Sequence, residues 1–223
     1  WQKTFMWDGA IHNLDVQALA PLSHSKEMAE TIQNVIVKLN KSEIYREAFY
    51  DAWQDSVATG EHFLKAIAQF QLTLVSANSK YDAVKAGELE FSPQEASGLE
   101  LFNQNCNSCH QAPLFSTYEF ANNGLSVDST LNDFGRYGIT QNSEDSLKFK
   151  IPSLRNLSYT YPYMHDGRFS TLHEVVNHYN TLRIDGSTNE HLSVPLNLSS
   201  KNKADLVSFL LALNDEEFVF NPQ

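Results

Sequence analysis

Two cysteines and a histidine within one short segment are the residues of this 223-residue sequence best suited to chemistry. The segment reads Cys106-Asn107-Ser108-Cys109-His110, and C-x-x-C-H is the attachment sequence of a c-type haem. In that chemistry the two thiols bond the porphyrin vinyl groups, and His110 binds the iron on its near side. The sequence has 2 cysteines, so a zinc site would lack a second ligand pair, and a disulfide would leave His110 unexplained. A redox dithiol would favour a βαβ setting, which the sequence does not show.

The far side of a haem iron takes a second ligand, whose type sets the redox potential and the chemistry. Spacing alone does not choose this ligand, because each available residue also has an ordinary packing or hydrogen-bonding role. The downstream candidates are Met164, His165, His173, His178, Tyr179 and His191.

The elements that must position the motif are predicted to be helical. Apolar residues recur at helical spacing over residues 26–39, 42–53 and 61–75. The expected buried side of the third helix consists of Phe63, Leu64, Ile67, Phe70, Leu74 and Val75. A capping serine, a proline at the first helical position and early acids predict a helix from Ser92 that leads into the haem motif. A last helix is predicted over residues 201–213.

These elements predict an all-α fold. A helix entering C-x-x-C-H and a late closing helix are the organisation of a class I cytochrome c domain, with the polar loops of residues 111–156 around the haem edge. The helical pattern is interrupted near residues 80–91, which divides the chain into domains 1–80 and 81–223.

Composition limits the partners and the compartment. A net charge of −11 argues against nucleic acid and is compatible with docking of small basic electron carriers, or simply with solubility. No apolar run approaches the length of a membrane span, and no signal peptide is visible in the sequence. Because haem is attached covalently outside the bacterial cytoplasm, we expect a periplasmic protein in a processed or shortened form.

Several further segments resemble the bacterial dihaem cytochrome c peroxidases and the related MauG enzymes. They lie in the family's order along nearly the whole chain and are highly specific together. The segments are Phe5-Met6-Trp7-Asp8-Gly9, Gln17-Ala18-Leu19-Ala20-Pro21-Leu22, Lys26-Glu27-Met28, residues 73–79, residues 149–156, Tyr161-Pro162-Tyr163-Met164-His165-Asp166-Gly167 and residues 171–176.

The resemblance implies that Cys106, Cys109 and His110 hold the electron-transfer haem of a two-haem enzyme. The family's far-side ligand lies on the helix after the His-Asp-Gly motif. It is methionine in the peroxidases and tyrosine in the MauG branch, and the matching position here is Tyr179. A phenolate ligand favours ferric iron and a lower potential than methionine gives. His178 is the nearest alternative.

The resemblance also assigns roles to residues outside the motif. Trp7 matches a tryptophan between the two haems, and Glu27 and Gln17 match the carboxylate and amide over the peroxide-reacting haem, where a base moves a proton. Without the resemblance, Glu27 reads as a first-turn acid and Gln17 as a surface amide. Pro21 matches a distal-pocket proline of the MauG branch.

The second half of the chain carries further expected sites. The backbone carbonyls of Thr160 and Pro162 match ligands of a calcium ion between the domains. Lys150 and Arg155 are candidates to pair with haem propionates, or are solvent-exposed charges. His165 is expected to hydrogen-bond near the haem, unless the His-Asp-Gly segment is only a turn.

One departure from the family pattern is serious. The peroxide-reacting haem has its own C-x-x-C-H upstream of the Trp-Asp-Gly segment, and this sequence contains a single such motif. We therefore expect a haem c on this chain, with the second haem supplied by a longer protein or a second chain. Residues 1–80 would then be the remainder of the peroxide-haem domain.

The expected function is that of a peroxidase or MauG-like oxidoreductase, which reduces hydrogen peroxide with electrons passed through a c-type haem. A small redox protein or a protein substrate would donate the electrons, and the family resemblance makes a homodimer one expected assembly. The alternatives are a monohaem electron-transfer protein without enzymatic activity and a haem-free structural module.

Overall fold

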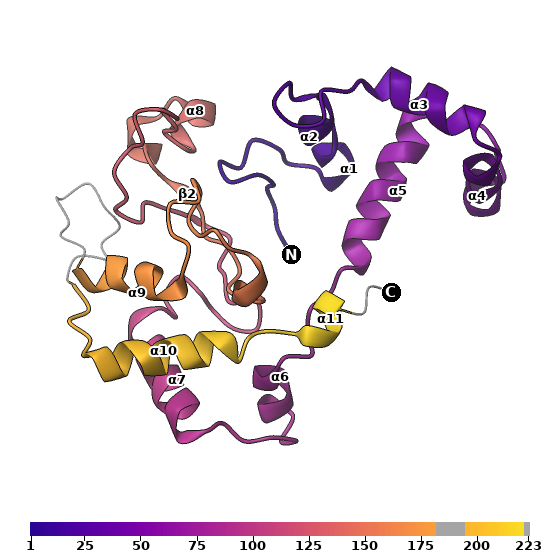
Figure 1. The fold of residues 1–223 in the computed structure, drawn as a ribbon. Coiled ribbons are helices and arrows are strands. Elements are labelled where there is room, and N and C mark those ends of the chain that lie inside the picture. Colours follow the sequence, from indigo (N-terminus) through magenta and orange to yellow (C-terminus); the bar gives the residue numbers. More distant parts are fainter. Residues whose placement is uncertain (182–194, 221–223) are drawn as a thin grey trace. The chain divides into compact units, whose positions relative to one another are not determined.

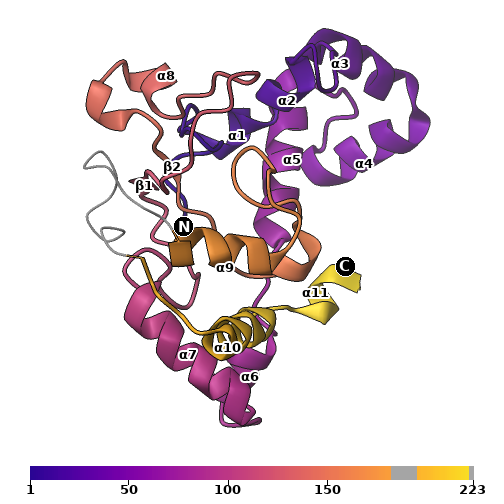
Figure 2. The same cartoon turned by 60° about the vertical axis from the view of Figure 1, so that its left-hand side comes forward.

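The computed structural model describes residues 1–181 and 195–220, and within them the chain is mostly helical. The chain divides into two compact units (Figures 1 and 2). The smaller unit comprises Trp1–Phe5 and Ile11–Val75, and the larger unit comprises Met6–Ala10 and Ser76–Gln223. The pentapeptide 6–10 is therefore part of the larger unit, although it precedes most of the smaller one in sequence.

The smaller unit is built from helices joined by short loops. They are α1 (Leu14–Gln17), α2 (Leu19–Ser23), α3 (Ile32–Lys41), α4 (Glu43–Trp53) and α5 (Gly60–Thr73). Helix α5 packs against α1 and α3. Phe49 is buried and stacks on Trp53, which in turn stacks on His62 with 5.0 Å between the ring centroids.

Two expectations for the smaller unit are wrong in detail. Helix α3 begins at Ile32, not near Lys26, because the Thr31 hydroxyl caps it by accepting a hydrogen bond from the amide of Asn34 (3.2 Å). The C-terminal part of the expected buried face of α5 is exposed: Phe70, Leu74 and Val75 have exposed fractions of 59%, 50% and 50%. Periodicity identifies an apolar face of a helix, but it does not show whether another element covers that face.

The larger unit contains the haem motif. Its helices are α6 (Lys80–Lys85), α7 (Pro93–Asn105), α8 (Tyr137–Thr140), α9 (Leu172–Thr181), α10 (Ser200–Leu211) and α11 (Glu216–Phe220), with 3-10 turns η1 (Ser143–Asp145) and η2 (Leu157–Tyr159). Two short strands, β1 (Phe120–Ala121) and β2 (Phe149–Lys150), pair antiparallel.

Helix α7 starts as expected, because Ser92 and Glu95 form a reciprocal capping box with Pro93 at the first helical position. Helix α6 also starts with a capping box, formed by Ser79 and Asp82, where sequence periodicity indicated only an interruption. Local capping chemistry therefore fixed a helix that apolar spacing did not reveal.

Helices α7 and α10 cross closely, and their contact forms the centre of the core (Figures 1 and 2). A Cβ atom at Gly98 would lie 2.0 Å from the backbone oxygen of Asp205, so only glycine allows this approach. Phe102, Phe115 and Phe209 are almost fully buried beside the crossing, with 5.0 Å between the ring centroids of Phe102 and Phe209. Burying each such ring contributes about 2–3 kcal/mol, so this cluster is a major source of the unit's stability.

Candidate haem site

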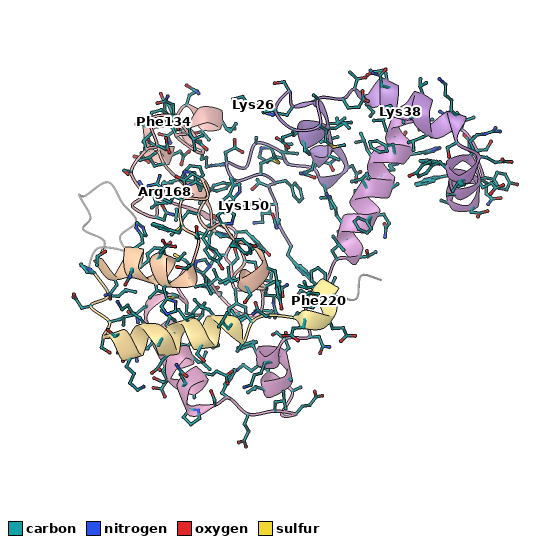
Figure 3. All side chains as sticks on the ribbon, viewed as in Figure 1. Lys26, Lys38, Phe134, Lys150, Arg168 and Phe220 are labelled. Atoms are coloured by element: carbon teal, nitrogen blue, oxygen red, sulfur yellow. The ribbon has the colours of Figure 1, made fainter. Side chains whose placement is uncertain are left out.

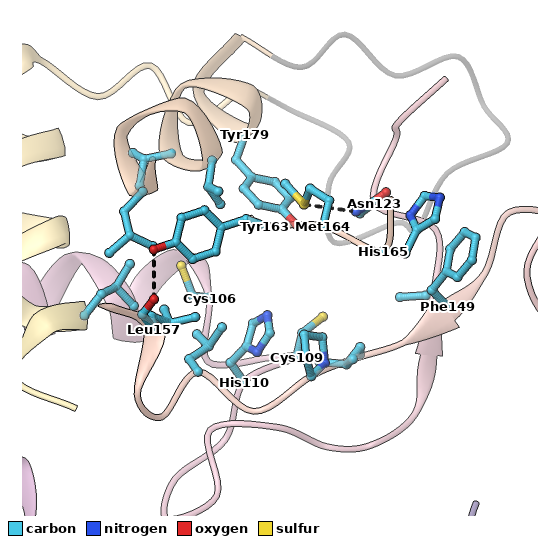
Figure 4. A pocket seen from close by; sticks show the side chains of 18 of the residues that line it. Cys106, Cys109, His110, Asn123, Phe149, Leu157, Tyr163, Met164, His165 and Tyr179 are labelled. Atoms are coloured by element: carbon cyan, nitrogen blue, oxygen red, sulfur yellow. Dashed lines mark hydrogen bonds between the residues drawn. The ribbon is translucent and has the colours of Figure 1, made fainter. Parts of the chain in front are cut away.

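A largely apolar pocket in the larger unit is lined by residues from the end of α7, the C-x-x-C-H loop, both strands, α9 and α10. Cys106, Cys109 and His110 lie along one side of it, and Tyr179 and Met164 lie along the opposite side (Figure 4). The two halves of the expected haem site thus face one shared space.

The C-x-x-C-H segment is held by backbone hydrogen bonds at the end of α7. The amide of Cys106 donates to the carbonyl of Phe102 (2.7 Å), and the amide of His110 donates to the carbonyl of Cys106 (2.9 Å). The Nδ1 atom of His110 lies 3.1 Å from the carbonyl oxygen of Phe115. Because a carbonyl can only accept, Nδ1 carries the proton, which leaves the lone pair on Nε2. An imidazole oriented in this way by a second bond is ready to bind a metal through Nε2.

The state of the thiols bears on two alternatives to a haem site, a redox dithiol and a disulfide. Burial, together with the neighbouring Cys109, raises the pKa of the Cys106 thiol to about 12. The thiol is therefore protonated at neutral pH and is a poor nucleophile, unlike the reactive cysteine of a redox dithiol. The two cysteines are also free thiols and not a disulfide.

Tyr179 enters the pocket from α9, and the start of this helix is well fixed. The Thr171 hydroxyl accepts from the amide of Glu174 (3.2 Å), and the Glu174 carboxylate accepts from the amide of Thr171 (2.8 Å). Leu172 and Val176 are buried and anchor the helix in the core. Burial and the nearby thiols raise the pKa of Tyr179, whereas a side-chain hydrogen bond with Asn123 lowers it.

The other far-side candidates are distributed differently. His178 does not line the pocket, and its Nε2 donates to the carbonyl of Asn123 (2.9 Å). His173 is exposed, and His191 lies outside the described residues. Met164 and His165 do line the pocket beside Tyr179.

The residues present fit a c-type haem. The pocket offers apolar walls for a porphyrin, two thiols for attachment, an imidazole oriented through its Nδ1, and a phenol on the opposite side. Among the described residues, the Nδ1 atom of His165 is one of the few buried side-chain atoms without a partner. This orphaned polar atom in the wall is suited to a polar group on a bound molecule.

His165 is held by its neighbours in an apolar setting. Its ring stacks on Phe149 with 3.7 Å between the centroids, and burial lowers its pKa, although Asp166 opposes this. Asp166 is bound by the guanidinium of Arg168, which also donates to the carbonyl of Ser126 (2.8 Å). The His-Asp-Gly segment is thus a turn that also places an imidazole in the pocket wall.

Trp7 reaches the pocket because the pentapeptide 6–10 is built into the larger unit. The amide of Lys150 on β2 donates to the carbonyl of Trp7 (2.7 Å), and Arg136 donates to the carbonyl of Asp8 (3.3 Å). Gly9 has φ +74°, and a Cβ atom there would lie 2.4 Å from Phe120. The Trp7 ring lines the pocket while 45% of the residue stays exposed, so it links the pocket to the surface.

The two candidate propionate partners have different surroundings. Lys150, labelled in Figure 3, lines the pocket, and burial lowers its pKa while Asp8 raises it. Arg155 does not line the pocket. Its guanidinium forms a bidentate pair with Asp82 (2.7 and 2.8 Å) and donates to the carbonyl of Pro113 (3.0 Å). This pair anchors α6, so the described contacts of Arg155 are with the fold and not with the pocket wall.

Gln17, Glu27 and Pro21 belong to the smaller unit, and none of them lines the pocket. The Gln17 Oε1 atom accepts from the Nε2 of Gln71 (3.1 Å). The Glu27 side chain is 48% exposed and lies 3.6 Å from Nδ1 of His24. Glu27 precedes α3 in a turn, so it is not the first-turn acid of a helix.

Thr160 and Pro162 are exposed residues just after η2. Within the described part of the chain, no group of three or more His, Cys, Asp or Glu side chains is arranged for a metal ion. No helix in residues 1–181 or 195–220 has both the length and the apolar character needed to cross a membrane.

Sequence reasoning missed Asn123, which contacts both Met164 and Tyr179. It lies in a polar loop (Asn122-Asn123-Gly124) without periodicity or spacing to single it out, and only the fold brings this loop to α9. Tyr163 was recognised only as part of a motif. Its hydroxyl donates to the carbonyl of Leu157 (2.8 Å) across the pocket wall.

Comparisons with known proteins identify relatives of this chain. The family model described as di-haem cytochrome c peroxidase matches residues 1–90. The methylamine utilization protein MauG of Methylophilus methylotrophus is 32% identical over 222 residues, 96% of this chain and 65% of that protein. The cytochrome c551 peroxidase of Nitrosomonas europaea is 32% identical over 188 residues, 82% of this chain and 56% of that protein.

The fold has relatives among solved structures. A MauG-like protein associated with microbial copper homeostasis superposes with a TM-score of 0.88 at 28% identity, over 100% of this chain and 75% of that one. The chain spans 65% and 56% of the lengths of the two curated relatives. Its sequence, fold and haem motif together show that the chain belongs to the family of dihaem cytochrome c peroxidases and MauG proteins.

Proposed function

We propose that this chain carries a covalent haem c on Cys106, Cys109 and His110 and works as part of a peroxidase-type oxidoreductase that reduces hydrogen peroxide. The observation that carries the proposal is the pocket itself, in which the attachment cysteines and His110 face Tyr179 across an apolar space. Family membership supports the peroxidase activity, which we assign to the whole enzyme of which this chain forms a part.

The larger unit, in this proposal, is a class I cytochrome c domain. The tight crossing of α7 and α10 at Gly98 supports this, because it joins the helix before the motif to the late closing helix. We assign the smaller unit to the remainder of the domain that holds the second haem.

In the proposed site each residue has a distinct task. The thiols of Cys106 and Cys109 would attach the haem through thioethers, and the Nε2 of His110 and the hydroxyl oxygen of Tyr179 would bind its iron. A haem held in this way would supply a one-electron centre whose phenolate ligand favours the ferric state. The Lys150 ammonium would pair with a propionate, and His165 would offer its unpartnered Nδ1 to the same bound group.

Trp7 is an aromatic residue that both lines the pocket and is exposed at the surface. Its backbone is fixed by Lys150 while its half-exposed ring lines the pocket, so the ring stays at a defined edge of the site. We propose that this ring couples the two haem sites of the intact enzyme.

In this proposal, the residues that act on hydrogen peroxide belong to the smaller unit. We propose that the carboxylate of Glu27 accepts a proton from one peroxide oxygen and returns it to the other, while the amide of Gln17 orients the peroxide. The bond from Gln71 supports this role, because it fixes the orientation of the Gln17 amide.

The setting of the enzyme completes the proposal. Covalent haem attachment supports a periplasmic location, and the carbonyls of Thr160 and Pro162 are proposed to bind calcium. A small redox protein or a protein substrate would donate electrons, and a homodimer is one proposed assembly.

Haem counting tests the core of the proposal. Pyridine-haemochrome absorbance and intact mass should show one covalent haem on the chain after maturation in a host that attaches haem c. A Cys106→Ala/Cys109→Ala variant should lose it, whereas a Ser108→Ala variant, altered between the cysteines, should keep it. A wild-type chain without covalent haem would refute the proposed site.

A monohaem electron-transfer protein is the second candidate, favoured by the single C-x-x-C-H motif in the sequence. Peroxide-dependent oxidation of a reduced small cytochrome separates the two candidates, when measured on the chain together with its second haem segment. Turnover that falls when Glu27 is changed to Gln supports the peroxidase. A haem-loaded assembly without turnover supports the carrier.

A further inference from the structure

Besides His165, two side chains able to bind iron line the pocket, and one asparagine contacts both. Met164 and Tyr179 each line the pocket opposite His110 (Figure 4). The Nδ2 atom of Asn123 lies 3.6 Å from the sulfur of Met164, and the Asn123 side chain also forms a hydrogen bond with Tyr179. The sequence offers a thioether and a phenol as alternative ligands, and the fold brings one carboxamide into contact with both.

The orientation of the Asn123 carboxamide is fixed by its other contacts. Its Oδ1 accepts from the amide of Leu125 (3.3 Å), which turns the NH2 group toward the far wall. Its backbone carbonyl accepts from Nε2 of His178 (2.9 Å), which ties the loop to α9 beside Tyr179. An NH2 group has two hydrogens, enough for one bond to the sulfur and one to the phenol oxygen.

The two bonds have opposite consequences for iron binding. A hydrogen bond donated to the Met164 sulfur occupies a lone pair that the thioether would otherwise offer to the iron. The bond with Tyr179 instead holds the phenol in the far wall of the pocket. The oxygen ligand that ferric iron prefers is thereby left available, whereas the softer thioether is engaged by Asn123.

We propose that Asn123 is a positioning residue that selects Tyr179 over Met164 as the far-side ligand of the haem on His110. The inference rests on the proposed haem site and deepens it, because it names the group that decides between two ligands within reach of one pocket. Asn123 acts through these side chains and does not itself bind the iron.

Two variants of Asn123 remove the selection in different ways. Asn123→Leu keeps the approximate volume and removes every polar atom of the side chain. Asn123→Asp keeps the acceptor for the Leu125 amide, removes the NH2 donors and adds a negative charge, so its absorption spectrum separates lost donation from a disturbed loop. Asn177→Leu is the matched control, because Asn177 lies on the exposed face of α9, the helix that carries Tyr179, and its carboxamide binds Lys203 (2.7 Å).

The readouts are the ferric absorption spectrum and the reduction potential of the haem-loaded chain, with haem content and circular dichroism confirming the fold. In both Asn123 variants we expect the thioether-to-iron charge-transfer band to appear, and in Asn123→Leu, which adds no charge, we also expect the potential to rise. Adding Met164→Leu to either variant should abolish the band. Met164→Leu alone and Asn177→Leu should resemble the wild type.

The outcomes distinguish this inference from the proposed function. If Tyr179→Phe changes the ferric spectrum while both Asn123 variants leave the spectrum and potential unchanged, the selection by Asn123 is refuted and the haem site stands. A rise in potential that persists after Met164→Leu refutes competition by the thioether. Absence of covalent haem, or a ferric spectrum unaffected by Tyr179→Phe, overturns the proposed site and the inference together.

Discussion

Replacing Gly98 with alanine should loosen the crossing of α7 and α10 and thereby weaken the haem site. The added Cβ would lie 2.0 Å from the carbonyl oxygen of Asp205, 2.7 Å from its carbonyl carbon and 2.8 Å from Cβ of Phe209. These atoms cannot turn away like the end of a flexible side chain, because two belong to the backbone and one is attached directly to it. Relief requires α10 to move by roughly 1 Å, which would open the core of closely packed aromatic rings.

The magnitude follows from two opposing terms. Overpacking of a filled core costs about 1–3 kcal/mol or more, and the short contacts place Gly98→Ala at the upper end of that range. Alanine in a helix regains about 0.5–1 kcal/mol relative to glycine. The net loss should be about 2 kcal/mol, which lowers the melting temperature by about 4–8 °C for a domain of this size.

Thermal unfolding followed by circular dichroism measures this loss, with Gly138→Ala as the matched control. Gly138 also lies in a helix, α8, but an added Cβ there meets nothing within 4 Å. The control should be unchanged or slightly stabilised. The contact geometry deduced here would be refuted by a Gly98→Ala variant as stable as the control.

Three further predictions concern the larger unit. Hydrogen bonding by Arg155 lowers the pKa of Asp82 to about 2, so the stability from this pair is complete above about pH 4 and disappears as the pH falls toward 2. Asp82→Asn should therefore lose about 2 kcal/mol at pH 7 in urea unfolding and show a flatter pH profile between 4 and 2. Asp215→Asn should cost about 2 kcal/mol by the same assay, because the buried carboxylate accepts from the Ser76 hydroxyl (3.1 Å) and the Asn78 amide (2.9 Å); equal stability would contradict this bonding. Tyr179→Phe should raise the reduction potential of the bound haem in spectroelectrochemical titration, and an unchanged potential would exclude the phenolate ligand.

Some elements were predictable because their signals are local. The start of α7 is specified by Ser92, Pro93 and Glu95, and the C-x-x-C-H spacing alone specified the position of the near-side imidazole. The position of Tyr179 followed from its offset after the His-Asp-Gly motif in the resembling family. These features need no knowledge of which segments meet in space.

Other features depend on contacts between distant residues, which periodicity does not contain. Arg155 reads as a surface cation in sequence, yet it binds Asp82, 73 residues away. Asn123 has no pattern of its own and gains its role when its loop meets α9. Phe70 belongs to the apolar periodicity of α5 but is exposed, because the described residues provide no cover for it.

The pentapeptide 6–10 also determines where the chain can be cut to separate its two units. Because the chain passes from the smaller unit to the larger one, back again, and finally across after Val75, three peptide connections join the units. A single cut after Val75 would leave the larger unit without the segment that offers the Trp7 carbonyl to Lys150. The haem-motif unit is therefore not a transferable module in its natural chain order. Grafting it onto another protein would require a rearranged chain in which residues 6–10 are rejoined to the larger unit.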